Sequence, residues 1–160
     1  MEKFKVLLVD DEEDFVKSLS ERLEMRDLES NVALNGKQAL ASMKADEPGV
    51  MVLDLKMPGM DGMEVLRRVR EAYPNVQVII LTGHGPDKEE EEAQRLGAYA
   101  YLQKPVEMDR LVDTLRKAHK KFKSIKHGLD TALMAASMAQ AGEVETARKM
   151  MKEETEDEEK

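Results

Sequence analysis

The sequence predicts a doubly wound α/β fold, in which helices cover both faces of a five-stranded parallel sheet, followed by a short helical extension. Three observations support this fold class. Short apolar runs alternate with longer stretches of helical periodicity. The runs are continuously aliphatic and β-branched, which is typical of strands buried on both faces. The length of 160 residues suits one ordinary domain with a small appendage. Strands that alternate with helices favour a parallel sheet with right-handed crossovers.

Five segments are predicted to be strands. Four of them are clear apolar runs and the second along the chain is weaker. In order they are Val6–Val9, Asn31–Leu34, Val50–Leu53, Val78–Leu81 and Ala98–Leu102.

Five helices are predicted between and after these strands, and all but the acidic, weakly apolar fourth are predicted from apolar residues three or four positions apart. The first helix carries Phe15, Leu19 and Leu23. The second follows Asn35-Gly36, the third follows Gly62, and the fourth covers 87–95 and is closed by Gly97. The predicted buried faces of the second, third and last helices are Ala39, Leu40 and Met43, then Val65, Leu66 and Val69, then Leu111, Val112, Leu115, Ala118 and Phe122.

The pattern changes near residue 122, so we expect a main domain over 1–122 and an extension over 123–160. The segment SIKHG is predicted to break the last helix. Beyond it, the Ala- and Met-rich stretch Leu129–Ala141 and the stretch Glu143–Met151 are predicted to be helical, with Gly142 between them. The acidic end, Glu153–Glu159, is predicted to be disordered.

Composition excludes several classes of protein. There is no cysteine, which removes disulfides and thiolate chemistry. The net charge of −8 argues against broad contact with nucleic acid. Nothing approaches the ~20 apolar residues that a membrane helix needs, and the apolar stretch near the N-terminus is too short for a signal peptide. We therefore expect a cytoplasmic protein that neither binds DNA nor enters a membrane.

Carboxylates gather where the predicted strands end. Asp10-Asp11 follow the first strand and Asp54 follows the third, while Thr82 ends the fourth and Lys104 follows the fifth. Ligands of doubly wound sheets bind at the carboxyl ends of the strands. Three carboxylates there would repel one another unless a cation intervened, and Mg²⁺ is a suitable cation. The pattern predicts phosphoryl transfer to Asp54, assisted by a metal. Helix capping could explain a lone Asp10 or Asp11, but neither Thr82 nor Lys104.

Four segments in register identify a family. They are VLLVDDE (Val6–Glu12), VLDLKMPGMDG (Val52–Gly62), ILTGHG (Ile80–Gly85) and YLQKP (Tyr101–Pro105). Together they resemble the response-regulator receiver domain of two-component signalling, over residues 5–122. The resemblance implies a flavodoxin-like sheet with strand order 2-1-3-4-5.

The resemblance also implies roles for individual residues. Asp54 would accept a phosphoryl group from a sensor histidine kinase or a phosphohistidine relay protein. Asp10 and Asp11 would hold Mg²⁺, or Mn²⁺ in its place, together with Asp54 and the backbone carbonyl of Lys56.

Further roles concern the rim of the site. Thr82 and Tyr101 match the family's switch pair, and Lys104 matches its invariant lysine, with a cis bond to Pro105. Lys56 and His84 would flank the path of the attacking water.

The sequence thus predicts a stand-alone response regulator that signals to a downstream protein target by contact and is not an enzyme in the ordinary sense. A homodimer through residues 87–122 or through the tail is compatible with the pattern.

Three alternatives stay open at this point: an Mg²⁺-dependent aspartyl-phosphate phosphohydrolase, a receiver-like adaptor that is not phosphorylated, and a flavodoxin-like cofactor binder. Asp10-Asp11 disfavours the last, because a phosphate cradle would need that turn. The basic cluster from Arg116 to Lys126 is predicted to be a solvated helix end.

Overall fold

The computed structural model describes residues 4–83 and 88–140, with side chains as far as residue 128. The predictions for His84, for a helix over 143–151 and for the acidic end at 153–159 lie outside the described residues. None of the helices in the described part of the chain is long and apolar enough to cross a membrane.

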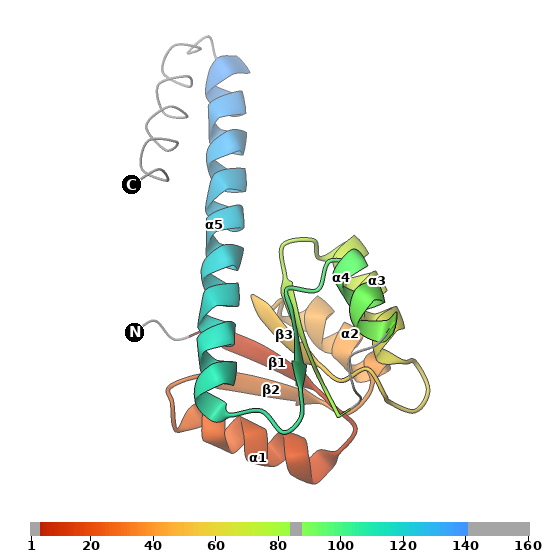
Figure 1. The fold of residues 1–160 in the computed structure, drawn as a ribbon. Coiled ribbons are helices and arrows are strands. Elements are labelled where there is room, and N and C mark those ends of the chain that lie inside the picture. The colour runs from red at the N-terminus through yellow and green to blue at the C-terminus, as the bar shows by residue number, and fades with distance from the viewer. Residues whose placement is uncertain (1–3, 84–87, 141–160) are drawn as a thin grey trace. The chain divides into compact units, whose positions relative to one another are not determined.

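Strands and helices alternate along the chain (Figure 1). The strands are β1 (Lys5–Val9), β2 (Glu29–Ala33), β3 (Val50–Leu53), β4 (Gln77–Thr82) and β5 (Ala100–Gln103). The helices are α1 (Glu13–Glu24), α2 (Gly36–Ala45), α3 (Gly62–Ala72), α4 (Lys88–Arg95) and α5 (Met108–Gln140).

All neighbouring strands pair in parallel, in the order β2-β1-β3-β4-β5. The predicted fold class and strand order are confirmed. Strand β1 lies between β2 and β3. From β1 the chain first forms the neighbour on one side, β2, and then crosses over to form β3, β4 and β5 in turn on the other side. The carboxyl ends of β1 and β3 therefore meet where the strand order reverses, which is the usual ligand position of such sheets.

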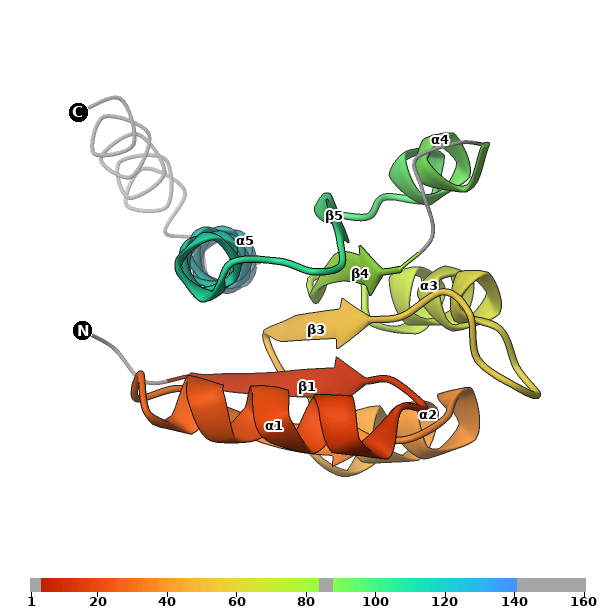
Figure 2. The ribbon, with the colours of Figure 1, turned by 60° about the horizontal axis from the view of Figure 1, so that its bottom comes forward.

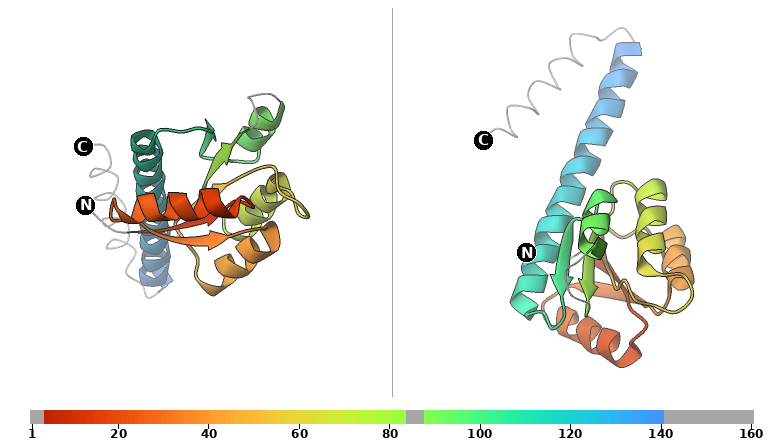
Figure 3. Two further views of the ribbon diagram at one scale, coloured as in Figure 1. Left: turned by 90° about the horizontal axis from the view of Figure 1, so that it is seen from below. Right: turned by 45° about the vertical axis from the view of Figure 1, so that its right-hand side comes forward.

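The side chains of alternate strand residues belong to two separate hydrophobic cores, one on each face of the sheet. On one face Leu8 and Val52 pack with residues of α1 and α5. On the other face Val9 and Leu53 pack with residues of α2, α3 and α4. Figures 2 and 3 show these helices on opposite sides of the strands. Every residue of β3 and β4 is buried, and accordingly β3 and the stretch Val78–Leu81 of β4 are unbroken apolar runs.

Local signals set the helix ends. The Asn35 side chain accepts a hydrogen bond from the Gln38 backbone N–H at 2.8 Å and caps α2. The Asp61 side chain accepts one from the Glu64 N–H at 3.0 Å and caps α3. Gly97, after α4, has a φ of +95°, a left-handed conformation that favours glycine.

Helix α5 corrects the prediction of a break at SIKHG, because it continues without interruption from Met108 to Gln140. A single glycine inside a helix costs only about 1 kcal/mol relative to alanine, which good helix formers on both sides offset. By packing, the chain separates into two compact units, Met1–Phe122 and Lys123–Lys160.

The buried face of α1 also differs from the predicted one. Val16, Leu19 and Leu23 are buried, whereas Phe15 is only partly buried. The helix is therefore turned so that the Phe15 ring lies at the margin of the core, on the side of the strand ends.

Candidate phosphoacceptor site

Two aspartates stand at the carboxyl ends of adjacent strands. The backbone N–H of Asp10 donates to the Ala33 carbonyl at 3.1 Å, and that of Asp54 donates to the Val9 carbonyl at 2.9 Å. These bonds extend the sheet ladder by one residue beyond β1 and β3. Asp10 is 4% exposed and Asp54 is 5% exposed. The sheet thus fixes both carboxylates at its rim and buries them.

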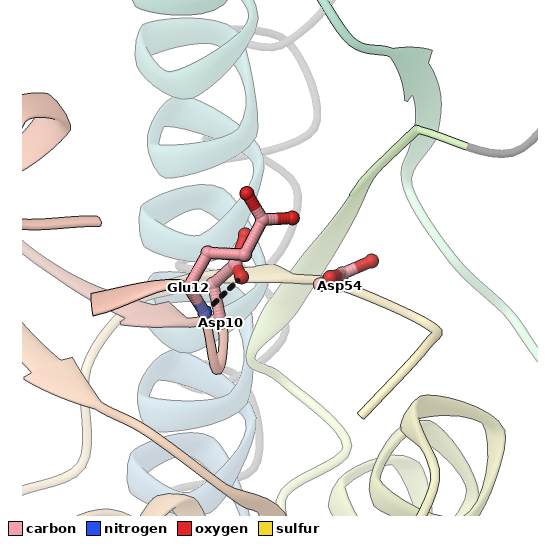
Figure 4. A group of neighbouring side chains, drawn as sticks. All are labelled: Asp10, Glu12 and Asp54. Carbon is pink, nitrogen blue, oxygen red and sulfur yellow. Dashed lines mark hydrogen bonds between the residues drawn. The ribbon is translucent and has the colours of Figure 1, made fainter. Parts of the chain in front are cut away.

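A third carboxylate, that of Glu12, joins them. One oxygen from each of Asp10, Glu12 and Asp54 lies within 4.8 Å of the others (Figure 4). The backbone N–H of Glu12 donates to Asp10 Oδ1 at 2.9 Å, which turns the loop back over the strand end. Likewise the Lys56 N–H donates to Asp54 Oδ1 at 3.3 Å.

Lys104 supplies the opposing charge. Its backbone N–H donates to the Thr82 carbonyl at 2.8 Å, which anchors the residue to the end of β4. Its Nζ lies 2.6 Å from Asp10 Oδ2 and 3.8 Å from Asp54 Oδ2, and only 14% of the side chain is exposed. The peptide bond to Pro105 is cis, as the resemblance implies. The ammonium group therefore bridges the two buried aspartates.

The remaining predicted site residues lie on β4 and β5. Thr82 is fully buried, and its side chain favours the ionised form of the Asp54 carboxyl group, which lowers the pKa of that group. Tyr101 is partly buried, pairs with Ile80 across the strands and packs against the core on the α3 side. Thr82 thus lies at the end of β4, and Tyr101 lies on β5, the strand that Lys104 directly follows.

Burial dominates the electrostatics of Asp54. Desolvation raises the pKa of its carboxyl group, and the charge of Lys104 opposes that rise. Asp10 adds to the rise, while hydrogen bonds from Lys56 and Thr82 oppose it, and the net direction is upward. For Lys104, burial lowers the pKa, but Asp10, Asp54 and Glu12 together raise it above its ordinary value. Lys104 is therefore held in its charged form, beside an Asp54 carboxyl group whose ionised form is disfavoured by burial.

This imbalance makes a stability prediction for Asp54→Asn. Because the folded-state pKa of Asp54 lies above its unfolded value, native stability falls as pH rises through that interval. Removing the charge should therefore raise the free energy of unfolding at pH 7, and the gain should shrink toward pH 4. Urea unfolding of both proteins at the two pH values, with a chelator present, measures it. A variant that is less stable at pH 7 would contradict the assigned direction.

The structure does not bring every predicted ligand into the cluster. Asp11 is exposed and lines a groove with Asn35, Lys37 and Arg68. The predicted Lys56 ligand is its backbone carbonyl, two residues after Asp54, and the pairing of the Lys56 Nζ with Glu89 of α4 at 2.7 Å leaves that carbonyl's role as a prediction. Glu12 was missed by sequence reasoning. The available signal was its position two residues after Asp10, where a turn at a strand end returns a side chain toward that strand.

The donor set fits a divalent cation. Mg²⁺ prefers oxygen ligands and commonly uses one or two carboxylates while keeping waters for a phosphate, and Mn²⁺ suits the same ligands. Asp10, Asp54 and Glu12 offer such oxygens within one coordination sphere. When bound, the cation would neutralise charge on an incoming phosphoryl group.

The parallel sheet in this order carries a buried acidic group, a bridging lysine and a threonine at its rim. Residues 6–116 match the family model described as the response regulator receiver domain, so the chain belongs to that family. Receiver domains of two-component systems are phosphoacceptors, not enzymes in the ordinary sense, and they interact with histidine kinases and downstream effectors.

Relatives support the assignment. The chain is 35% identical to sporulation initiation phosphotransferase F of Bacillus subtilis, over 71% of this chain and 91% of that protein. It is 34% identical to the C4-dicarboxylate transport transcriptional regulatory protein DctD of Rhizobium meliloti, over 82% of this chain but only 29% of DctD. The chain thus spans little more than a quarter of that regulator's length. A solved receiver domain protein from Clostridium thermocellum superimposes with a TM-score of 0.72 at 31% identity, over 76% of this chain and 98% of that one.

Proposed function

We propose that the chain is a response regulator that takes a phosphoryl group on Asp54 from a histidine kinase or a phosphohistidine relay protein. The observation that carries the proposal is the Lys104 ammonium, which lies between Asp10 and Asp54 in a buried site. A buried cation beside a buried carboxylate is poised to hold the additional negative charge that a phosphoryl group brings. Capping of helices would require no such lysine.

The chain's own residues can perform the transfer. An ionised Asp54 oxygen forms a bond to phosphorus while the bond between phosphorus and the donor's imidazole nitrogen breaks. Lys104 Nζ, 3.8 Å from Asp54 Oδ2, is close enough to pair with the transferred group by a short movement of its side chain. The Thr82 hydroxyl, buried at the end of β4, can donate to a phosphoryl oxygen on Asp54.

The metal in this proposal would be held first by Asp10 and Asp54. Asp11 and the Lys56 backbone carbonyl are the ligands that the family resemblance adds, and Glu12 is the carboxylate that lies within the observed cluster. The ligand set is thus proposed as two buried aspartates plus a third group from the loop after β1 or the loop after β3.

Output is proposed to occur through contact with a downstream protein. The acidic composition supports this, because a net charge of −8 disfavours a DNA surface. The relative from Bacillus subtilis, which this chain covers almost entirely, is named a phosphotransferase. DctD, by contrast, is named a transcriptional regulatory protein.

Transfer of labelled phosphate from an autophosphorylated histidine kinase tests the proposed donor. The native chain should take up the label, whereas Asp54→Asn should stay unlabelled under the same conditions. Label on both proteins would remove Asp54 from the proposal. If a panel of histidine kinases and relay proteins from its own organism left the native chain unlabelled, the proposal that such proteins donate the phosphoryl group would be contradicted.

A further inference from the structure

An aromatic ring lies against the ammonium group of Lys104. The Nζ atom is 4.2 Å from the centre of the Phe15 ring. At this distance the electron-rich face of the ring attracts a cation. Phe15 is two residues into α1, whereas Lys104 follows β5, so the contact joins distant parts of the sequence.

The Phe15 ring also contacts the hydrophobic core. Phe15 packs against the core between the sheet, α1 and α5, and it lines a small cavity with Leu8, Val52 and Asp54. Its partial burial is therefore that of a side chain fixed at the edge of the core. A ring in this position can restrain a flexible lysine side chain, which otherwise has many rotamers.

The contact complements the carboxylates without competing with them. Asp10, Asp54 and Glu12 offer oxygens to Nζ at 2.6, 3.8 and 3.7 Å. The aromatic face attracts the charge as a whole, so the N–H groups stay directed at oxygen acceptors. Glu12 is 64% exposed at its side chain, and an unrestrained ammonium group could follow it toward solvent.

We propose that Phe15 is a positioning residue for phosphoryl transfer, whose ring face holds the Lys104 ammonium group beside Asp54. The inference rests on the proposed function, because it assigns Phe15 to the same reaction. Phe15 touches neither the phosphoryl donor nor the reacting atoms, and it acts only through Lys104.

Fluorinated phenylalanines at position 15 test the proposal. Successive ring fluorines weaken the attraction for a cation while the shape and apolar character of the side chain are largely kept. The rate of Asp54 phosphorylation by a small acyl phosphate should fall stepwise along the series, by roughly three- to ten-fold for the trifluorinated ring. The thermal midpoint should not follow that order. Trifluorination of Phe122, a partly buried ring on α5, should leave the rate unchanged.

Phe15→Leu separates the ring face from simple packing. It keeps an apolar side chain without a π face, and it should be at least as slow as the trifluorinated protein. Equal rates across the fluorinated series would overturn the proposal, even if Phe15→Leu were slow, because packing alone would then explain the loss. If the unsubstituted chain formed no adduct on Asp54, the proposed function itself would fail and this inference with it.

Discussion

Replacing Lys104 by methionine is expected to slow phosphorylation of Asp54 by about 10²–10³-fold, the usual loss when one preorganised donor to a developing charge is removed. The same change should lower the free energy of unfolding at pH 7 by about 3 kcal/mol, because two buried carboxylates lose their counter-charge. Lys104 lowers the pKa of Asp54, so that pKa should rise further in the variant. The deficit in stability should therefore shrink as pH falls and Asp54 takes up a proton.

Lys117 offers a matched control for this experiment. It forms an i,i+4 ion pair with Asp113 on α5, and both side chains are about two-thirds exposed, at 67% and 63%. Lys117→Met should change the stability by less than about 0.5 kcal/mol and leave the phosphorylation rate as it is. Urea unfolding and the rate of adduct formation from a small acyl phosphate measure both effects. Equal behaviour of the two variants would contradict the central role given to Lys104.

Gly62→Ala is expected to displace the backbone of the segment that carries Asp54. A Cβ atom at Gly62 would lie 2.4 Å from the Asp54 carbonyl oxygen and 2.5 Å from the Leu55 Cα, both of them backbone atoms. The backbone must then shift, which costs about 1–3 kcal/mol or more. The Gly62 N–H also donates to the Leu55 carbonyl at 3.0 Å, so the start of α3 is tied to the segment that carries Asp54.

The shift should reach the carboxylate, because Asp54 and its carbonyl move together. We expect phosphorylation to slow by about ten-fold or more, since small misplacements of reacting groups are costly. Gly83→Ala is the control. Gly83 directly follows Thr82, yet a Cβ there meets nothing within 4 Å. Its stability should stay within about 0.5 kcal/mol of the native value. A Gly62→Ala protein with native stability and rate would contradict the close packing.

The bounds of the central strands could be predicted to within about one residue, whereas those of the edge strands β2 and β5 could not. Strand β3 matches its predicted run, because a strand that is covered on both faces is continuously apolar along most of its length. Strand β2 lies at the sheet edge and exposes several side chains, so its pattern was weak and its start was placed two residues late. The missed continuation of α5 has a different cause, since a single glycine lowers helix propensity without ending the helix.

The site was predictable as far as topology determines it. Parallel strands bring Asp10, Asp54, Thr82 and Lys104 to one rim, and strand order then makes Asp10 and Asp54 neighbours. The turn after β1 was not predictable, because its backbone decides whether Asp11 or Glu12 faces Asp54. The contact between Phe15 and Lys104 depends on a small rotation of α1, which no spacing pattern encodes.

Intact mass after incubation with Mg²⁺ and a small acyl phosphate tests the central claim most directly. The native chain should gain the mass of one phosphoryl group, and Asp54→Asn should gain none. An adduct that persists in Asp54→Asn would contradict the assignment of the phosphoacceptor. A native chain that stays unmodified while a control receiver reacts would contradict the phosphoacceptor role altogether, and the chain would then be a receiver-like adaptor.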